Sequence, residues 1–89
     1  MQIIELDKFP GMEFVKVSRV AYGKKNLPQK KREYKASGEF DSPVGTVSEW
    51  VAFIRRNKSK LRFDGIVCVD HLDKKWYVYN TKGELIGEV

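Results

Sequence analysis

Only one segment of this sequence repeats its apolar residues at helical spacing, and that segment limits the folds open to the chain. The apolar residues fall at positions i, i+3, i+4 and i+7, which is one stripe of an amphipathic helix: Val47, Trp50, Val51 and Ile54. Just before the stripe, Thr46 and Glu49 have the spacing of a capping box, in which each side chain bonds to the other residue's backbone N–H. The pattern predicts one helix over about residues 47–58.

The segments on both sides of this helix are short and rich in β-branched and aromatic residues, a composition typical of strands. They cover residues 2–6, 14–22, 66–69, 76–79 and 84–89, with 33–40 as a further candidate. Turns are expected at Asp7–Gly11, His71–Lys74 and Asn80–Gly83. We therefore expect one α+β domain over residues 1–89. Its antiparallel sheet of about five to six strands carries one helix across one face, in the order β-β-(β)-α-β-β-β.

Some details of this sheet stay open. Residues 14–40 form either a hairpin with a basic tip or a strand followed by a mobile loop. Arg19 shares a strand face with Val15 and Val17, so we expect a bulge or a frayed edge there. Side chains alternate along the expected strand 76–79, which places Trp76 on one face and Tyr77 and Tyr79 on the other. We expect all three rings to join Trp50 in the core, with the face that carries the two tyrosines partly exposed.

The composition excludes several classes of protein. The longest apolar runs have four or five residues, far fewer than the roughly 20 of a membrane-spanning helix. The N-terminal residues lack the pattern of a secretory signal. The single cysteine, Cys68, lies in a strand-like run, where we expect it to pack as a small buried hydrophobe. A cytoplasmic protein without cofactor or metal is the expectation.

Positive charge is concentrated in the middle of the chain. Residues 16–62 hold 13 Lys or Arg against 4 Asp or Glu, whereas the two flanks hold 4 against 8. Such an asymmetry bears on partners rather than on fold. It predicts that the central part of the chain meets an anionic partner.

The first basic cluster lies between the second and third expected strands. Its cations are bracketed by two tyrosines: the set is Tyr22, Lys24, Lys25, Lys30, Lys31, Arg32, Tyr34 and Lys35. Lysine and arginine bind phosphates with release of counterions, and aromatic faces can stack on bases. This cluster therefore favours nucleic-acid contact, although a solvated loop would have a similar composition.

The second basic cluster follows the helix and includes Arg55, Arg56 and Lys58. Cations at a helix C-terminus also stabilise the helix dipole. The cluster continues with Lys60 and Arg62, which is more charge than capping requires. We expect at least one of Arg55 and Arg56 to be exposed.

No catalytic residues are assigned. His71 lies in Asp70-His71-Leu72-Asp73, which is typical of a turn, and no second histidine is present to complete a zinc site. The tripeptide Glu33-Tyr34-Lys35 matches the E-x-K of some nucleases, but so short a match is weak. The sequence favours a non-enzymatic nucleic-acid-binding protein that contacts phosphates. The alternative is a small adaptor or inhibitor that docks its basic face on an acidic protein, and a small ribonuclease is a weaker third possibility.

Overall fold

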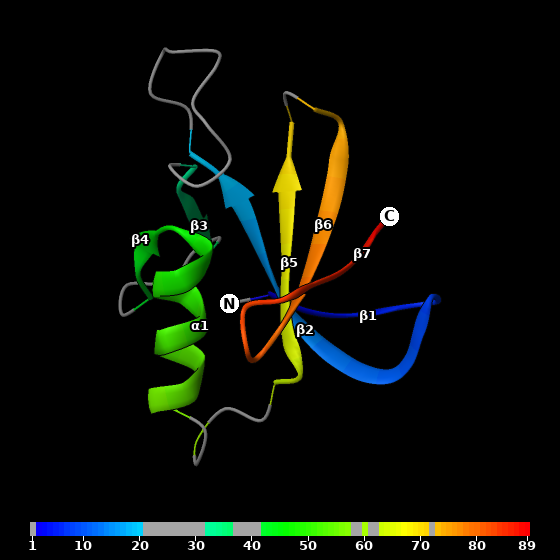
Figure 1. Ribbon diagram of the computed structural model, residues 1–89, viewed down its shortest axis with the longest axis horizontal. Helices are drawn as coiled ribbons and strands as arrows, with labels where there is room; N and C mark the ends of the chain where they lie inside the picture. The colour runs from blue at the N-terminus through cyan, green and yellow to red at the C-terminus, as the bar shows by residue number, and fades with distance from the viewer. Residues whose placement is uncertain (1, 21–31, 37–41, 58–59, 61–62, 72) are drawn as a thin grey trace.

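The computed structural model describes residues 2–20, 32–36, 42–57, 60, 63–71 and 73–89. Within them, the helix α1 (Val47–Arg56) lies against one face of a twisted sheet (Figure 1). The strands are β1 (Gln2–Leu6), β2 (Phe9–Arg19), β3 (Tyr34–Ala36), β4 (Val44–Gly45), β5 (Gly65–Asp70), β6 (Lys75–Asn80) and β7 (Leu85–Glu88). They lie in the order β4-β3-β2-β5-β6-β7, and β1 pairs with β2. This is an α+β fold with a mostly antiparallel sheet, as predicted.

The pairing of β2 with β5 differs from the prediction, because these two strands are parallel. All the other strand pairs are antiparallel. A parallel pair needs a long crossover, and here β3, β4 and α1 provide it. The two-residue strand β4 is a further addition to the predicted order, and it is too short to leave a pattern in the sequence.

Strand β2 begins and ends earlier than predicted. The segment Pro10-Gly11, predicted as part of a turn, lies inside β2 instead, where Gly11 has a φ of +79°. The register shows why: Leu6 pairs with Phe9 and Ile4 pairs with Phe14, so β2 has extra residues opposite β1. Such a bulge bends a strand, and it accommodates a proline that cannot donate to the ladder.

Helix α1 confirms the predicted helix. The Glu49 carboxylate accepts a hydrogen bond from the backbone N–H of Thr46 at 3.3 Å, as the capping box predicts. Trp50, Val51 and Ile54 are buried. The indole N–H of Trp50 donates to the carbonyl of Tyr34 at 2.8 Å, which ties the helix to β3.

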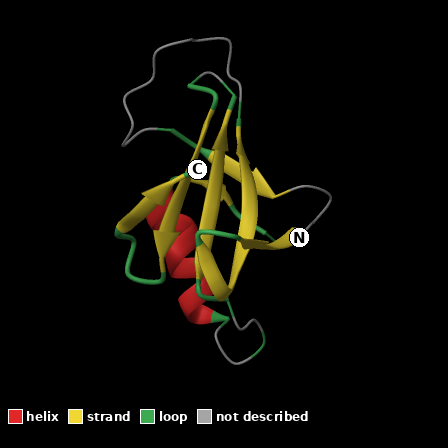
Figure 2. Cartoon of the chain, turned by 90° about the vertical axis from the view of Figure 1, so that its right-hand side faces the viewer, coloured by secondary structure: helices red, strands yellow, loops and turns green. Residues whose placement is uncertain are grey.

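The sheet carries an apolar cluster on each face. The cluster beneath α1 includes Val15, Trp50, Cys68 and Tyr79, and we call this side the helix-side face. Figure 2 shows α1 behind the sheet, so the opposite side, the helix-free face, is turned toward the viewer. The cluster there is formed by Leu6, Phe14, Val67 and Val78, with Phe9, Met12, Trp76 and Ile86 packed around it.

The aromatic residues of β6 are divided between these two clusters. Tyr77 and Tyr79 belong to the helix-side cluster, and Tyr79 is buried rather than exposed. Trp76 packs on the other face, so the expectation of a common core with Trp50 was wrong. The predicted alternation was correct, but a second apolar cluster was not foreseen.

Cys68 is a free, fully buried thiol, as predicted. Burial and the nearby charge of Asp70 raise the pKa of this thiol far above its ordinary value. No helix among the described residues is both long enough and apolar enough to cross a membrane.

Candidate nucleic-acid interface

Strands β2 and β3 pair antiparallel and form the stem of a hairpin. Whether its basic tip is ordered, the alternative left by the sequence, lies outside the described residues. Val17 pairs with Ala36, and Arg19 pairs with Tyr34. Beyond the ladder, the backbone N–H of Val20 donates to the carbonyl of Glu33 at 2.8 Å. The residues that this stem connects lie outside the described part of the chain, and they include Tyr22, Lys24, Lys25, Lys30 and Lys31.

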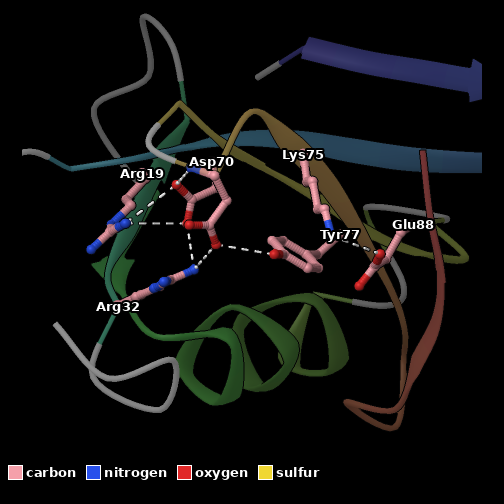
Figure 3. Close-up of polar contacts among 7 residues, drawn as sticks. Arg19, Arg32, Asp70, Lys75, Tyr77 and Glu88 are labelled. Atoms are coloured by element: carbon pink, nitrogen blue, oxygen red, sulfur yellow. Dashed lines mark hydrogen bonds and ion pairs between the residues drawn. The ribbon is translucent and has the colours of Figure 1, made fainter. Parts of the chain in front are cut away.

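Arg19, at the end of this stem, makes an ion pair in the protein interior. Because β2 and β5 are parallel, their C-terminal residues Arg19 and Asp70 follow directly after the last pair of the register. One Arg19 nitrogen lies 3.2 and 3.3 Å from the two carboxylate oxygens of Asp70 (Figure 3). The two side chains are only 5% and 0% exposed. This pair, rather than a bulge or a frayed edge, explains a cation on the apolar face of β2.

Arg32, on the other side of the stem, completes the network (Figure 3). Its guanidinium lies 2.6 Å from the carboxylates of both Asp70 and Asp73. Asp73 also accepts a hydrogen bond from the Tyr77 hydroxyl at 3.0 Å. Asp70, at the end of β5, therefore binds one arginine from each arm of the hairpin. We call the following five residues the stem network: Arg19, Arg32, Asp70, Asp73 and Tyr77.

The protonation of the stem network follows from these contacts. Burial acts to lower the pKa of Arg32, but the hydrogen bond to Asp73 and the charges of both carboxylates outweigh burial and raise it. The hydrogen bonds from Arg32 and Tyr77 lower the pKa of Asp73. Burial and the bond to Asp73 raise the pKa of Tyr77. All three shifts favour the charge states that hold the network together.

The stem network is suited to anchoring rather than to binding a ligand. Its two arginines and two aspartates balance in charge, and the Arg32 side chain is only 14% exposed. Arg32 was predicted as a phosphate contact, but its guanidinium is engaged by two carboxylates. The sequence could have shown a role for Asp70 only if the parallel pairing of β2 and β5 had been known.

Tyr34 was predicted as a stacking group, and its burial contradicts this. The residue is 0% exposed and belongs to the cluster beneath α1. Its hydroxyl has no hydrogen-bond partner within the described residues, and burial raises its pKa far above the ordinary value. A ring enclosed in this way cannot stack on a base.

The remaining predicted cations lie on different faces. Arg55 and Arg56 are both exposed in the last turn of α1, as expected for at least one of them. Lys35 is exposed on the helix-free face, since its neighbours Tyr34 and Ala36 point into the helix-side cluster. Lys58 lies outside the described residues. The structure thus separates Lys35 from the helix arginines.

The helix-free face holds two residues that were not predicted as site residues. Lys16, on β2, has its ammonium 4.9 Å from the ring centroid of Trp76, on β6. Both side chains are half-buried. The alternation of Val15, Lys16 and Val17 along β2 was visible in the sequence, but the position of Trp76 required the register of the sheet.

Two further features lie away from the stem network and from the pair of Lys16 and Trp76. A pocket of about 410 Å³ beside the end of α1 is lined by Ile54, Arg55, Phe63, Thr81 and Lys82. His71 is exposed in the turn after β5. Among the described residues, no group of three or more His, Cys, Asp or Glu is placed to hold a metal ion.

Comparison of the chain with protein-family models gave no match. Comparisons with curated proteins and with solved structures gave no match either. The functional argument therefore rests on the residues and their geometry.

Proposed function

We propose that this protein binds nucleic acid without catalysing a reaction, and that the segment connecting β2 to β3 supplies phosphate contacts. The observation that carries the proposal is the anchored stem. Arg19 and Arg32 hold the two ends of the hairpin on Asp70, and residues 21–31 between them contain four lysines and no Asp or Glu.

An anchored stem favours binding for an energetic reason. Ordering a segment on a ligand costs conformational entropy, roughly 1–2 kcal/mol for each residue whose backbone is fixed. Because the ion pairs with Asp70 already hold Arg19 and Arg32, these two residues add nothing to this cost on binding. A run of lysines without acids also gains from counterion release at phosphates.

The decisive experiment is a binding titration against duplex DNA, single-stranded DNA and RNA at two salt concentrations. The test variant is Lys30→Gln/Lys31→Gln, which leaves the stem network intact. The control is Lys75→Gln/Lys82→Gln, which removes two exposed lysines, one at the start of β6 and one in the β6–β7 turn.

We expect the test variant to weaken binding to all sequences alike. On duplex DNA it should lower the slope of log K against log salt by nearly two units, since each phosphate contact contributes about 0.9. The control should leave the slope unchanged. If the wild type binds none of the three ligands at low salt, the proposal is wrong, and an acidic protein partner becomes the explanation for the central positive charge.

A further inference from the structure

The helix-free face of the sheet carries two lysines in neighbouring cross-strand rows. Of the four acids in the strands, Asp70 and Glu88 lie on the helix-side face, because Cys68, two residues before Asp70, and Tyr77, the register partner of Glu88, belong to the cluster beneath α1. The cations Arg19 and Lys75 pair with them there. Two cross-strand rows on the helix-free face carry Lys16 and Lys35 but no Asp or Glu. The rows are Val44–Lys35–Ser18–Val69–Trp76 and Lys16–Val67–Val78–Gly87.

This face is covered in part in the described structure, since Val67 and Val78 of the lower row are fully buried. No helix among the described residues covers it (Figure 2). The β1–β2 hairpin packs over the lower row, where Phe9 lies close to Gly87. In the upper row, Val44 and Lys35 are exposed and Ser18 and Trp76 half-buried, whereas Val69 is buried. The acid nearest to Lys35 in the sequence is Glu33, which comes just before β3.

The pairing of Lys16 with Trp76 indicates what such a face can bind. An ammonium above an aromatic face is held by a cation–π interaction, and at 4.9 Å it covers the indole in the free protein. A phosphate attracts an ammonium more strongly than a ring does, and a base stacks on an indole. One nucleotide can therefore satisfy both partners of the pair at once.

We propose that the helix-free face binds single-stranded nucleic acid across the strands. A base stacks on Trp76, and Lys16 and Lys35 contact phosphates. This inference rests on the proposed function, and it names the form of nucleic acid and a second binding surface. Trp76 and Lys35 are three strands apart, which is about 14 Å at the usual spacing between strands. A single strand can present both bases and phosphates to a flat surface, whereas duplex bases are already paired and stacked.

Tryptophan fluorescence provides a direct test. The protein has two tryptophans, and Trp50 is fully buried with its N–H bonded to Tyr34. A change in emission on adding oligothymidylate should therefore report Trp76. We expect single strands to change the emission, duplex DNA to change it little, and Trp76→Leu to abolish the change. Circular dichroism would verify that this variant remains folded.

Affinity is measured separately, from the anisotropy of a labelled single strand. Trp76→Leu should weaken binding by roughly 5- to 150-fold, the usual effect of losing one stacked base. Lys16→Gln/Lys35→Gln should lower the salt slope by about 1.4 units, at about 0.7 per contact on a single strand. Lys75→Gln/Lys82→Gln is again the control, because Lys75 pairs with Glu88 on the helix-side face.

The outcomes separate the two proposals. If Lys30→Gln/Lys31→Gln weakens binding while both variants of the helix-free face bind like the wild type, this inference is overturned and the proposed function stands. If the wild type binds neither single strands nor duplex at low salt, both are overturned.

Discussion

Asp70 is the residue on which the hairpin stem depends. Its carboxylate is wholly buried and bonds to Arg19, Arg32 and the backbone N–H of Asp73. The guanidinium groups of Arg19 and Arg32 thus approach each other because the Asp70 carboxylate lies between them. Conformational specificity is one documented use of such buried ion pairs, and here the pair holds β2, β3 and β5 in one arrangement.

Replacing Asp70 by Ala should destabilise the protein by about 3–5 kcal/mol, since it leaves the buried guanidinium of Arg19 without its partner. Urea unfolding of the purified variant measures this loss. Asp73→Asn is the matched control, because the Asp73 carboxylate is 35% exposed and water can replace its contacts. Equal effects of the two substitutions would contradict an anchoring role for Asp70.

Helix α1 is the element that the sequence described best. Its cap, its apolar stripe and its length are local features, so they could be identified without knowledge of the fold. The same holds for the hairpin of β6 and β7, where Gly83 adopts a φ of +83° and the Asn80 side chain accepts from the backbone N–H groups of Lys82 and Glu84.

Elements defined by distant contacts could not be predicted in the same way. Arg19 pairs with a residue 51 positions away, so no local pattern distinguishes it from a surface cation. Tyr34 looked like an aromatic flank of the basic segment, but its ring is enclosed by α1 and β5 side chains. The prediction of Tyr34 as a stacking group was wrong because it depended on which face of the sheet the residue occupies.

Removing the Trp50 side chain tests how firmly α1 holds the sheet. Trp50→Ala should cost about 3–5 kcal/mol, as is usual for a large buried aromatic, and it also removes the hydrogen bond to Tyr34. Ser48→Ala, at an exposed position of the same helix, should change stability by less than about 0.5 kcal/mol. A melting temperature unaffected by Trp50→Ala would mean that α1 is not packed as described.

At the scale of the whole molecule, one sheet supports two apolar clusters. Residues adjacent in sequence enter opposite clusters: Phe14 and Val15 do so on β2, Val67 and Cys68 on β5, and Val78 and Tyr79 on β6. Because three central strands serve both clusters, neither cluster can lose its packing while the other keeps its strands. The faces are therefore chemically distinct but mechanically joined.

This coupling predicts a single cooperative unfolding transition in urea. Far-UV circular dichroism follows the sheet and helix, and tryptophan emission follows both clusters through Trp50 and Trp76. Labelling of Cys68 by a thiol reagent follows exposure of the innermost strand, because the native thiol is fully buried. The three probes should give the same midpoint, as two-state unfolding requires. In the native protein, the Cys68 thiol should react only as fast as the protein opens. An earlier midpoint for tryptophan emission alone would mean that one cluster unfolds without the other. Rapid labelling of native Cys68 would contradict the burial of its thiol in the cluster beneath α1.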